Sequence, residues 1–315
     1  MNKAIVTGAN GFLATWLIRE LRKNDLLVYA IIREQAVADK WMLEDEKIIP
    51  INCDMENYYY LPKIINETSI DYVFHLSWMG NSTMGTSLLY ETQLNNVLYG
   101  LKLIEAAHFM NVKRFICTGS IHEIELITEL FNNYPFDQTN HYYKSAKLSL
   151  HAMGKTLAAQ YNIEYFNPIL FNTYGEYDTS NRLVSYVIST MLDGKIPSVS
   201  SGKQLYELLH VSDVVHALYL IAVYGKNGCE YSITTGKFRP LKEYLVIIEK
   251  IVNQYTNQKI CLDFGGHQAP AISLDKYKII DSSLLRYHTG FKPKVSFENG
   301  IKRTMQWLIE QKQRK

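Results

Sequence analysis

Long apolar runs, paired cysteines and an excess of one charge sign are all missing from this sequence of 315 residues. No apolar stretch approaches the roughly 20 residues that a membrane-spanning helix needs, so we expect no membrane segment. The cysteines are scattered, with no Cys-x-x-Cys pair and no histidine at ligand spacing, which favours free thiols over a disulfide framework. They are Cys53, Cys117, Cys229 and Cys261. We therefore expect no metal site.

The charge is nearly balanced, with Lys+Arg 33 against Asp+Glu 31. This balance leaves no basic footprint for nucleic acid, and we expect no nucleic-acid partner. The segment from Met1 to Gly8 leads into a strand-like run without a basic leader, from which we expect a protein of the reducing cytoplasm. A hydrophobic content of 47% at this length allows a large core with an appended lobe.

Short apolar runs alternate with helical patterns through the first half of the chain. The runs are Ala4–Val6, Leu26–Ile32, Ile48–Ile51, Tyr72–Leu76, Phe115–Cys117 and Tyr165–Phe171. Helical spacing connects most of them, as in Phe12 to Leu21. This alternation predicts an α/β fold with a doubly wound parallel sheet, because parallel neighbours need long crossover connections. After about Gly175 turns become more frequent, which predicts a smaller lobe.

The segment from Thr7 to Ala14 places Gly8, Gly11 and Ala14 three residues apart, between the first strand and the first helix. Glycine lets the backbone approach a pyrophosphate, and the helix presents unpaired amide hydrogens to it. A small residue such as Ala14 lets the helix lie close to the strand. The pattern therefore predicts a dinucleotide-binding turn.

The end of the second strand predicts which dinucleotide binds there. Ile32 stands where an acidic residue would bind the ribose 2′-hydroxyl, and Arg33 follows, able to pair with a 2′-phosphate. The alternative is a surface arginine paired with Glu34. We predict NADP(H).

Tyr143 and Lys147 lie one turn apart on the same face of an expected helix. A cation beside a phenol favours phenolate and so makes the phenol a usable acid–base group. Ser120 follows the run Phe115–Cys117 at a distance that allows the three to converge. A hydroxyl such as that of Ser120 would orient a substrate carbonyl, and Tyr143 would give it a proton while hydride arrives from a nicotinamide. We predict Ser120, Tyr143 and Lys147 to be catalytic.

These residues resemble the extended short-chain dehydrogenase/reductase family essentially from end to end. Further motifs that resemble it are Asn52-Cys53-Asp54-Met55, Phe74-His75-Leu76-Ser77, Asn96-Val97-Leu98-Tyr99-Gly100, Phe171-Asn172-Thr173-Tyr174-Gly175 and His210-Val211-Ser212-Asp213-Val214. The resemblance implies a Rossmann-type domain over 1–168, a smaller α/β substrate lobe over 169–315 with segments that return to the first, and a homodimer formed through the helices near Tyr90 to Phe109 and Tyr143 to Gln160. The cofactor residues that it implies are Thr7, Gly8, Asn10, Gly11, Phe12, Leu13, Arg33, Asp54, Met55, Leu76, Ser77, Asn96, Thr118, Tyr143, Lys147 and Phe171.

Within the family, Gly119-Ser120-x-x-Glu123 and Tyr177-Asp178 with Arg182-Leu183 resemble enzymes acting on nucleoside-diphosphate 4-keto-6-deoxyhexoses, mostly 4-ketoreductases. The substrate residues that this implies are Trp78, Gly80, Ser120, His122, Glu123, Asn172, Arg182 and Tyr206. Many relatives have an arginine where Tyr206 stands and another where Gly265 to Ala271 offers none. Candidates to replace them are Arg182, Lys203, Arg239 and Arg286.

The residues also bear on two other reactions and on a non-catalytic function. A dehydratase resembling this family needs an acidic pair where Ile121 and His122 stand, which argues against dehydration. A redox-neutral 4-epimerase using bound NAD is the first alternative, and Arg33 disfavours it. A non-catalytic NADP-binding protein is the second, disfavoured by the intact trio. His122 is interpreted as a polar wall of the pocket, with a catalytic role as the alternative.

Overall fold

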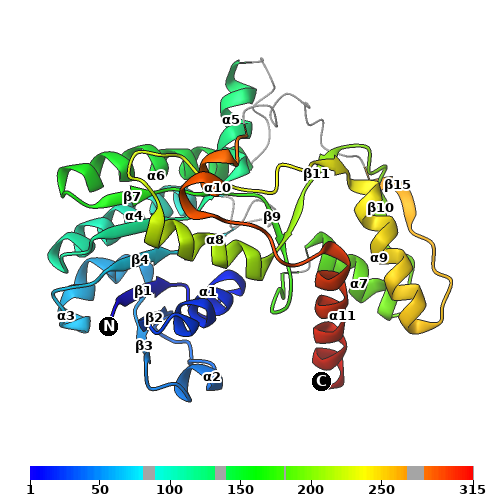
Figure 1. Ribbon diagram of the computed structural model, residues 1–315, viewed down its shortest axis with the longest axis horizontal. Coiled ribbons are helices and arrows are strands. Elements are labelled where there is room, and N and C mark those ends of the chain that lie inside the picture. The colour runs from blue at the N-terminus through cyan, green and yellow to red at the C-terminus, as the bar shows by residue number, and fades with distance from the viewer. Residues whose placement is uncertain (81–88, 132–139, 181, 268–279, 315) are drawn as a thin grey trace. The chain divides into compact units, whose positions relative to one another are not determined.

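The computed structural model describes residues 1–80, 89–131, 140–180, 182–267 and 280–314 (Figure 1). The chain forms two compact units, each described here by itself. The first consists of Met1–Leu170, Val215–Ile233 and Ser283–Phe291, and the second of Phe171–Val214, Thr234–Ser282 and Lys292–Lys315. Their roles as cofactor domain and substrate lobe stay predictions.

The first unit is built on a parallel sheet of six strands in the order β3-β2-β1-β4-β5-β7. The strands are β1 (Lys3–Thr7), β2 (Leu27–Ile32), β3 (Ile48–Asn52), β4 (Tyr72–His75), β5 (Arg114–Cys117) and β7 (Glu164–Phe166). The order reverses between β1 and β4, which is the switch point where doubly wound sheets bind ligands beyond their strand ends. The predicted Rossmann-type α/β fold is confirmed.

The helices from α1 to α6 connect these strands, and α8 and α10 follow the last of them in the chain. They are α1 (Phe12–Lys23), α2 (Lys40–Leu43), the 3-10 helix η1 (Met55–Tyr60), α3 (Leu61–Ile65), α4 (Tyr90–Phe109), α5 (Ile121–Phe131), α6 (Asn140–Gln160), α8 (Val211–Tyr224) and α10 (Ser283–Thr289). The long helices α4 and α6 run side by side (Figure 1). Their apolar faces pack with Ile5, Val73 and Phe115 of the sheet in one core cluster. This packing holds the start of α6 near the ends of the strands.

The predicted single strand over Tyr165–Phe171 is wrong. The run divides into β7 and β8 (Ile169–Leu170), and Pro168 lies between them. Proline has no backbone N–H to donate to a central ladder, so β7 ends before it. Beyond the break, β8 joins a second parallel sheet with β6 (Gly119–Ser120) and β13 (Ser232–Ile233). This second sheet places Gly119 and Ser120 opposite Ile169 and Leu170.

The second unit contains shorter elements. They are β9 (Asn172–Tyr174), α7 (Leu183–Leu192), β10 (Ser198–Ser200), β11 (Leu205–Tyr206), β12 (Leu208–His210), β14 (Arg239–Pro240), α9 (Leu241–Thr256), β15 (Asp263–His267) and α11 (Phe297–Gln313). The strands form the pairs β9-β12, β10-β15 and β11-β14. The core lies among α7, α9 and α11, whose buried side chains include Val187, Ile248 and Ile301.

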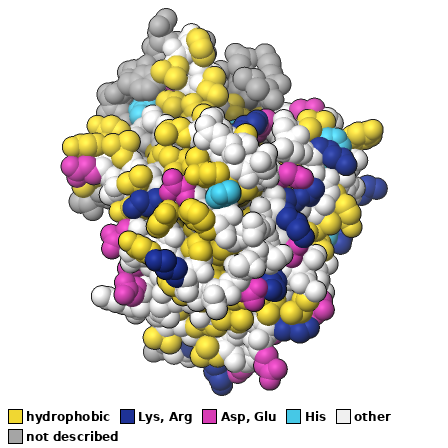
Figure 2. Space-filling model, turned by 90° about the vertical axis from the view of Figure 1, so that its left-hand side faces the viewer, with side chains coloured by type: hydrophobic (Ala, Val, Ile, Leu, Met, Phe, Trp, Pro, Cys, Tyr) yellow, Lys and Arg dark blue, Asp and Glu magenta, His cyan; other side chains and the backbone are white. Residues whose placement is uncertain are grey.

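The surface carries charges of both signs. Figure 2 shows basic and acidic side chains interspersed with hydrophobic ones over one face of the molecule. Among the described residues, no helix is both long enough and apolar enough to cross a membrane.

Candidate active site

The turn between β1 and α1 forms a close-fitting backbone cradle. Gly8 has a φ of +70°, and a Cβ there would lie 3.1 Å from the Cα of Ser77. A Cβ on Gly11 would lie 3.0 Å from the carbonyl oxygen of Gly8. No side-chain hydrogen bond caps α1 at Gly11, and no acidic residue lies in its first turn, so the positive end of the helix dipole can attract an anion. These features fit the pyrophosphate of a dinucleotide.

Thr7 ties the ends of β1 and β4 together. Its Oγ1 accepts hydrogen bonds from the backbone N–H groups of Leu76 (3.1 Å) and Ser77 (3.2 Å) and lies 3.0 Å from Nδ1 of His75. Burial and the charge of Lys147 lower the pKa of His75 to about 3, so this histidine is neutral. Thr7, Leu76 and Ser77 therefore hold the floor of the cradle in one geometry.

The residues predicted to bind the adenosine end of the cofactor lie near the end of β2. Arg33 is exposed and forms no ion pair with any carboxylate in the described part of the chain, so the alternative pairing with Glu34 is not formed. Asp54 Oδ1 accepts from the backbone N–H of Glu34 (3.1 Å), and Asn10 Nδ2 donates to the Val37 carbonyl (3.0 Å). The adjacent Met55 packs against the core. The guanidinium of Arg33 is thus available to a phosphate.

Two of the predicted catalytic residues, Tyr143 and Lys147, contact the same tryptophan. The buried Lys147 donates from Nζ to the Thr118 carbonyl (3.0 Å), and its Nζ lies 3.7 Å from the ring centroid of Trp78. The ring of Tyr143 meets the same indole edge-to-face, with centroids 5.9 Å apart. Trp78 therefore links the two residues of α6 that sequence spacing singled out.

Ser120 ends β6 at the beginning of α5. Its Oγ accepts from the backbone N–H of His122 (3.3 Å), and the His122 ring lies edge-to-face with Tyr143 at 5.7 Å. Because Oγ accepts this bond, its own hydrogen remains available to a substrate oxygen. Ser120, His122 and Tyr143 thus line one region of the first unit.

The turn after β4 is fixed by α4. Asn96 accepts from the Met79 backbone N–H at 2.8 Å and donates to the Met79 carbonyl at 2.9 Å, while Trp78 Nε1 donates to Gln93 at 3.0 Å. Gly80 follows in the left-handed region, with a φ of +72°. Asn96, which was predicted to bind cofactor, uses its amide to position this turn. Gln93 was missed because its sequence signal is that of any polar helix residue.

Glu123 is buried and is held by groups of the protein. Its carboxylate accepts from the backbone N–H of Ser120 (2.8 Å), His151 Nδ1 (2.9 Å) and Asn167 Nδ2 (3.2 Å), and the side chain is buried. These three donors hold the carboxylate in one orientation. Its predicted contact with substrate stays untested, whereas its contact with the backbone of Ser120 is direct.

Phe171, which was predicted to bind the cofactor, and the remaining predicted substrate residues belong to the second unit. Phe171 packs against Phe238, Asn172 Nδ2 donates to the Glu207 carbonyl (3.3 Å), and the half-exposed Arg182 pairs with the buried Asp178 at 3.2 Å. Tyr206 lies opposite Arg239 in the β11-β14 pair.

The basic residues that were candidates to replace the missing diphosphate-binding arginines differ in their surroundings. The guanidinium of Arg239 lies 3.9 Å from the ring centroid of Tyr244, and Lys203 is exposed. Arg286 is in the first unit. Positions 268–271 of the arginine-free segment from Gly265 to Ala271 lie outside the described residues.

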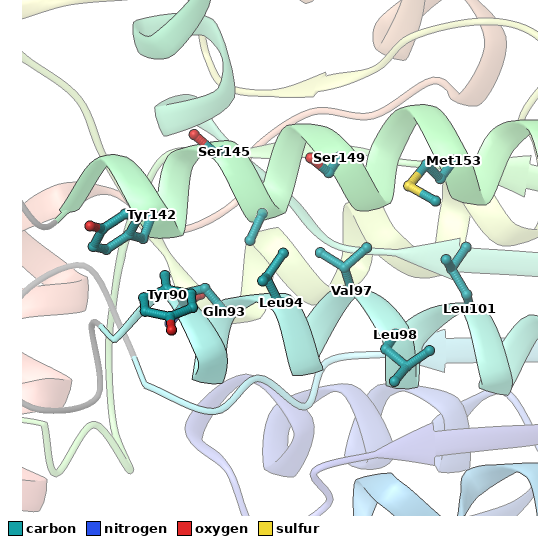
Figure 3. A pocket seen from close by; sticks show the side chains of 11 residues that line it. Tyr90, Gln93, Leu94, Val97, Leu98, Leu101, Tyr142, Ser145, Ser149 and Met153 are labelled. Atoms are coloured by element: carbon teal, nitrogen blue, oxygen red, sulfur yellow. The ribbon is translucent and has the colours of Figure 1, made fainter. Parts of the chain in front are cut away.

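An apolar groove runs between α4 and α6 (Figure 3). Its lining includes Tyr90, Leu94, Leu98, Tyr142 and Met153, all of them exposed. Exposed apolar side chains in such a concentration are typical of surfaces that bind protein.

A glycine turn at the switch point of a doubly wound sheet, with a Tyr-Lys pair on a neighbouring helix, is typical of dinucleotide-dependent enzymes. The model of the NAD dependent epimerase/dehydratase family matches residues 4–234. The chain belongs to this family.

Curated relatives match it over nearly its whole length. It is 26% identical to dTDP-glucose 4,6-dehydratase 1 of Escherichia coli strain K12, covering 98% of this chain and 92% of that protein. It is 25% identical to CDP-abequose synthase of Salmonella typhimurium strain LT2, covering 96% and 97%. Among solved structures, the UDP-glucuronic acid 4-epimerase of Bacillus cereus, in complex with UDP-glucuronic acid and NAD, has a TM-score of 0.76 at 18% identity, covering 98% and 99%. At this identity, the similarity to the solved structure shows a shared fold and nothing more.

Proposed function

We propose that the chain is an NADPH-dependent oxidoreductase that reduces the 4-keto group of a nucleoside-diphosphate 4-keto-6-deoxyhexose. The similarity to curated proteins named for dTDP- and CDP-sugars supports a nucleotide sugar as the substrate class. The observation that carries the proposal is the gathering of Tyr143, Lys147 and Ser120 in the unit that holds the cradle.

The proposed roles follow from the contacts. The nicotinamide supplies the hydride when it is bound. Tyr143 gives its phenolic proton to the carbonyl oxygen, and Ser120 donates its free hydroxyl hydrogen to the same oxygen. The ammonium of Lys147, fixed by the Thr118 carbonyl and the Trp78 ring, supplies positive charge beside the phenol.

The proton donor is tested by Tyr143→Phe. NADPH oxidation with a 4-keto-6-deoxyhexose nucleotide should fall by about 10²–10⁴-fold, while NADPH binding stays unchanged. The matched control is Tyr142→Phe, which removes the hydroxyl of the exposed neighbouring tyrosine and should turn over normally. Equal turnover of both variants would reject Tyr143 as the donor.

NADP(H) is proposed because Arg33 is exposed and lacks a carboxylate partner in the described chain. Losing charged hydrogen bonds to a 2′-phosphate costs about 1.5–3 kcal/mol, so Arg33→Gln should weaken NADPH binding about tenfold or more while NADH binding is unaffected. Tightly retained NAD in the purified protein would instead favour the redox-neutral 4-epimerase.

A homodimer is proposed through the groove between α4 and α6. Leu94 and Leu98 are 62% and 48% exposed there, and apolar side chains so exposed are stabilised by a covering partner. Leu94→Glu should convert a dimer to monomers in sedimentation velocity experiments. A monomeric wild-type protein would reject the proposal.

A further inference from the structure

The indole of Trp78 is fixed on its nitrogen side by α4. Its Nε1 donates to Oε1 of Gln93 at 3.0 Å, and Gln93 in turn donates from Nε2 to the Met79 carbonyl at 3.2 Å. Gln93 is 1% exposed, and Trp78 packs against the core cluster of the first unit. The plane of the indole ring is therefore set by groups that take no part in the proposed reduction.

One face of this indole is covered by a cation. Nζ of Lys147 lies 3.7 Å from the ring centroid. An ammonium within about 6 Å of the centroid is attracted by the negative face of an aromatic ring, and tryptophan attracts it most strongly. The attraction grows when water is excluded, and Lys147 is 8% exposed. The contact thus joins a buried charge to the type of ring best able to hold it.

The partners of this buried ammonium are neutral. Nζ of Lys147 donates to the Thr118 carbonyl at 3.0 Å, and Lys147 forms no ion pair with a carboxylate in the described part of the chain. Burial disfavours a charged amine unless nearby groups stabilise the charge. The Thr118 carbonyl and the face of Trp78 are the two groups of the protein that provide this stabilisation.

A neutral partner has a consequence that a carboxylate would not have. A carboxylate beside the ammonium would cancel most of its field at the phenol, because the two charges are opposite in sign. The indole carries no net charge, so the positive charge stays uncompensated one helical turn from Tyr143, whose ring meets the same indole edge-to-face at 5.9 Å. A positive charge beside a phenol favours phenolate, the form that arises when Tyr143 gives up its proton.

We propose that Trp78 is a positioning residue, which holds the charge of Lys147 beside Tyr143 and acts on the reaction through that lysine. The inference rests on the proposed reduction and gives Trp78 a role other than the predicted contact with substrate. The two roles differ in their kinetics. Loss of a substrate contact raises KM at unchanged kcat, whereas loss of a group that supports the proton donor lowers kcat.

The kinetic test begins with Trp78→Leu, which keeps the position apolar but removes the ring face. For NADPH-dependent reduction of a nucleoside-diphosphate 4-keto-6-deoxyhexose, kcat should fall about 10- to 100-fold, while KM for the sugar nucleotide stays within about twofold. Trp78→Phe keeps a smaller ring and should recover part of the rate. A raised KM at unchanged kcat in Trp78→Leu would make Trp78 a substrate contact and overturn the inference.

The matched control is Trp41→Leu. Trp41 also covers a cation, since the guanidinium of Arg19 lies 4.3 Å from its ring centroid, but it belongs to α2 and contacts none of the predicted catalytic residues in the described chain. This variant should have the kcat of the wild type. A fall in kcat equal to that of Trp78→Leu would show that the loss of any such tryptophan slows the enzyme, and would overturn the specific role of Trp78.

A tetrafluorinated tryptophan introduced at position 78 separates attraction from packing. Fluorine withdraws electron density and removes most of the negative face of the ring, while the shape of the side chain and its N–H group are kept. The kcat should fall toward that of Trp78→Leu, and the midpoint of thermal unfolding checks that the fold is retained. A kcat equal to that of the wild type would overturn the inference.

The contact with Lys147 is also tested without substrate. Lysines are labelled with ¹³C at Cε, and the signal of Lys147 is identified by its loss in Lys147→Met. The ring current of the indole should shift the attached protons upfield in the wild type but not in Trp78→Leu. Absence of this shift in the wild type overturns the inference whether or not the chain reduces a sugar nucleotide.

The outcomes separate the two proposals. A wild type that shows the upfield shift but reduces no 4-keto sugar nucleotide rejects the reductase and leaves Trp78 as the residue that positions Lys147. Reduction by the wild type with an undiminished kcat in Trp78→Leu and in the fluorinated protein rejects the role of Trp78 and leaves the reductase intact.

Discussion

The first two turns of α5 contribute to two histidine–carboxylate pairs, which differ in their surroundings. Glu123 and His151 are joined at 2.9 Å, as Glu125 and His122 are at 2.6 Å. The Glu123 side chain is 2% exposed and points to the β6–β8 side, where it also binds Asn167. His122 is 29% exposed and lies against Tyr143.

The difference shows that similar pairs can have different roles when their burial differs. The carboxylate of Glu123 has three protein donors, one of them the backbone N–H of Ser120, so it fixes the junction of β6 and α5. The carboxylate of Glu125 orients an imidazole whose other nitrogen has no hydrogen-bond partner in the described part of the chain. One pair therefore holds the site in place, and the other lies open beside Tyr143.

The largest effect on stability is expected when the buried pair is broken. Glu123→Gln keeps the shape of the side chain but leaves the imidazolium of His151 without its buried counter-charge, which should lower the free energy of unfolding by about 3 kcal/mol. Glu125→Gln is the matched control on the same helix and should cost less than about 1 kcal/mol. Urea denaturation of both variants checks this. Equal shifts in midpoint would show that the two pairs are energetically alike.

A smaller effect on stability is expected when the pH is raised and His151 loses its proton. Burial acts to lower the pKa of this histidine, but the hydrogen bonds to Glu123 and Glu230 outweigh it and raise the pKa to about 9. The folded pKa lies above the ordinary value of 6.5, so the stabilisation is complete below pH 6.5 and is lost as the pH rises through about 9. We expect the wild type to lose about 2 kcal/mol over this window.

His151→Gln is the comparison for that titration. Its unfolding free energy, measured in urea at intervals between pH 6 and pH 10, should change less over the same window than that of the wild type. Parallel curves for the two proteins would mean that His151 is not stabilised as an imidazolium.

Local patterns in the sequence were sufficient for much of the fold and part of the site. The cradle at Gly8 and Gly11 and the pair Tyr143–Lys147 each depend on residues within a few positions, so spacing alone predicts them. The sheet followed from alternation, although Pro168 should have been read as a break in the predicted strand. The assigned roles of these residues stay predictions.

Contacts that depend on tertiary packing could not be predicted. Glu123 and His151 are 28 residues apart on different helices, and nothing in either local pattern indicates the other. Gln93 meets Trp78 only because α4 packs beside the turn after β4. The pair His122–Glu125, by contrast, has helical spacing and could have been read from the sequence had α5 been predicted to begin at Ile121.

The smallest effect on the free energy of unfolding is expected for the exposed ion pair of Glu230 and Lys155, beside His151. Glu230 joins His151 at 3.2 Å and also pairs with Lys155, whose side chain is 45% exposed against 51% for Glu230. Surface ion pairs contribute little because water screens them and ordering both side chains costs entropy. Lys155→Met should therefore change the free energy of unfolding by about 0.5 kcal/mol or less in urea. If Lys155→Met lowered the free energy of unfolding as much as Glu123→Gln, the exposed ion pair would contribute as much stability as the buried one. The contrast between the buried and the open pair would then no longer hold.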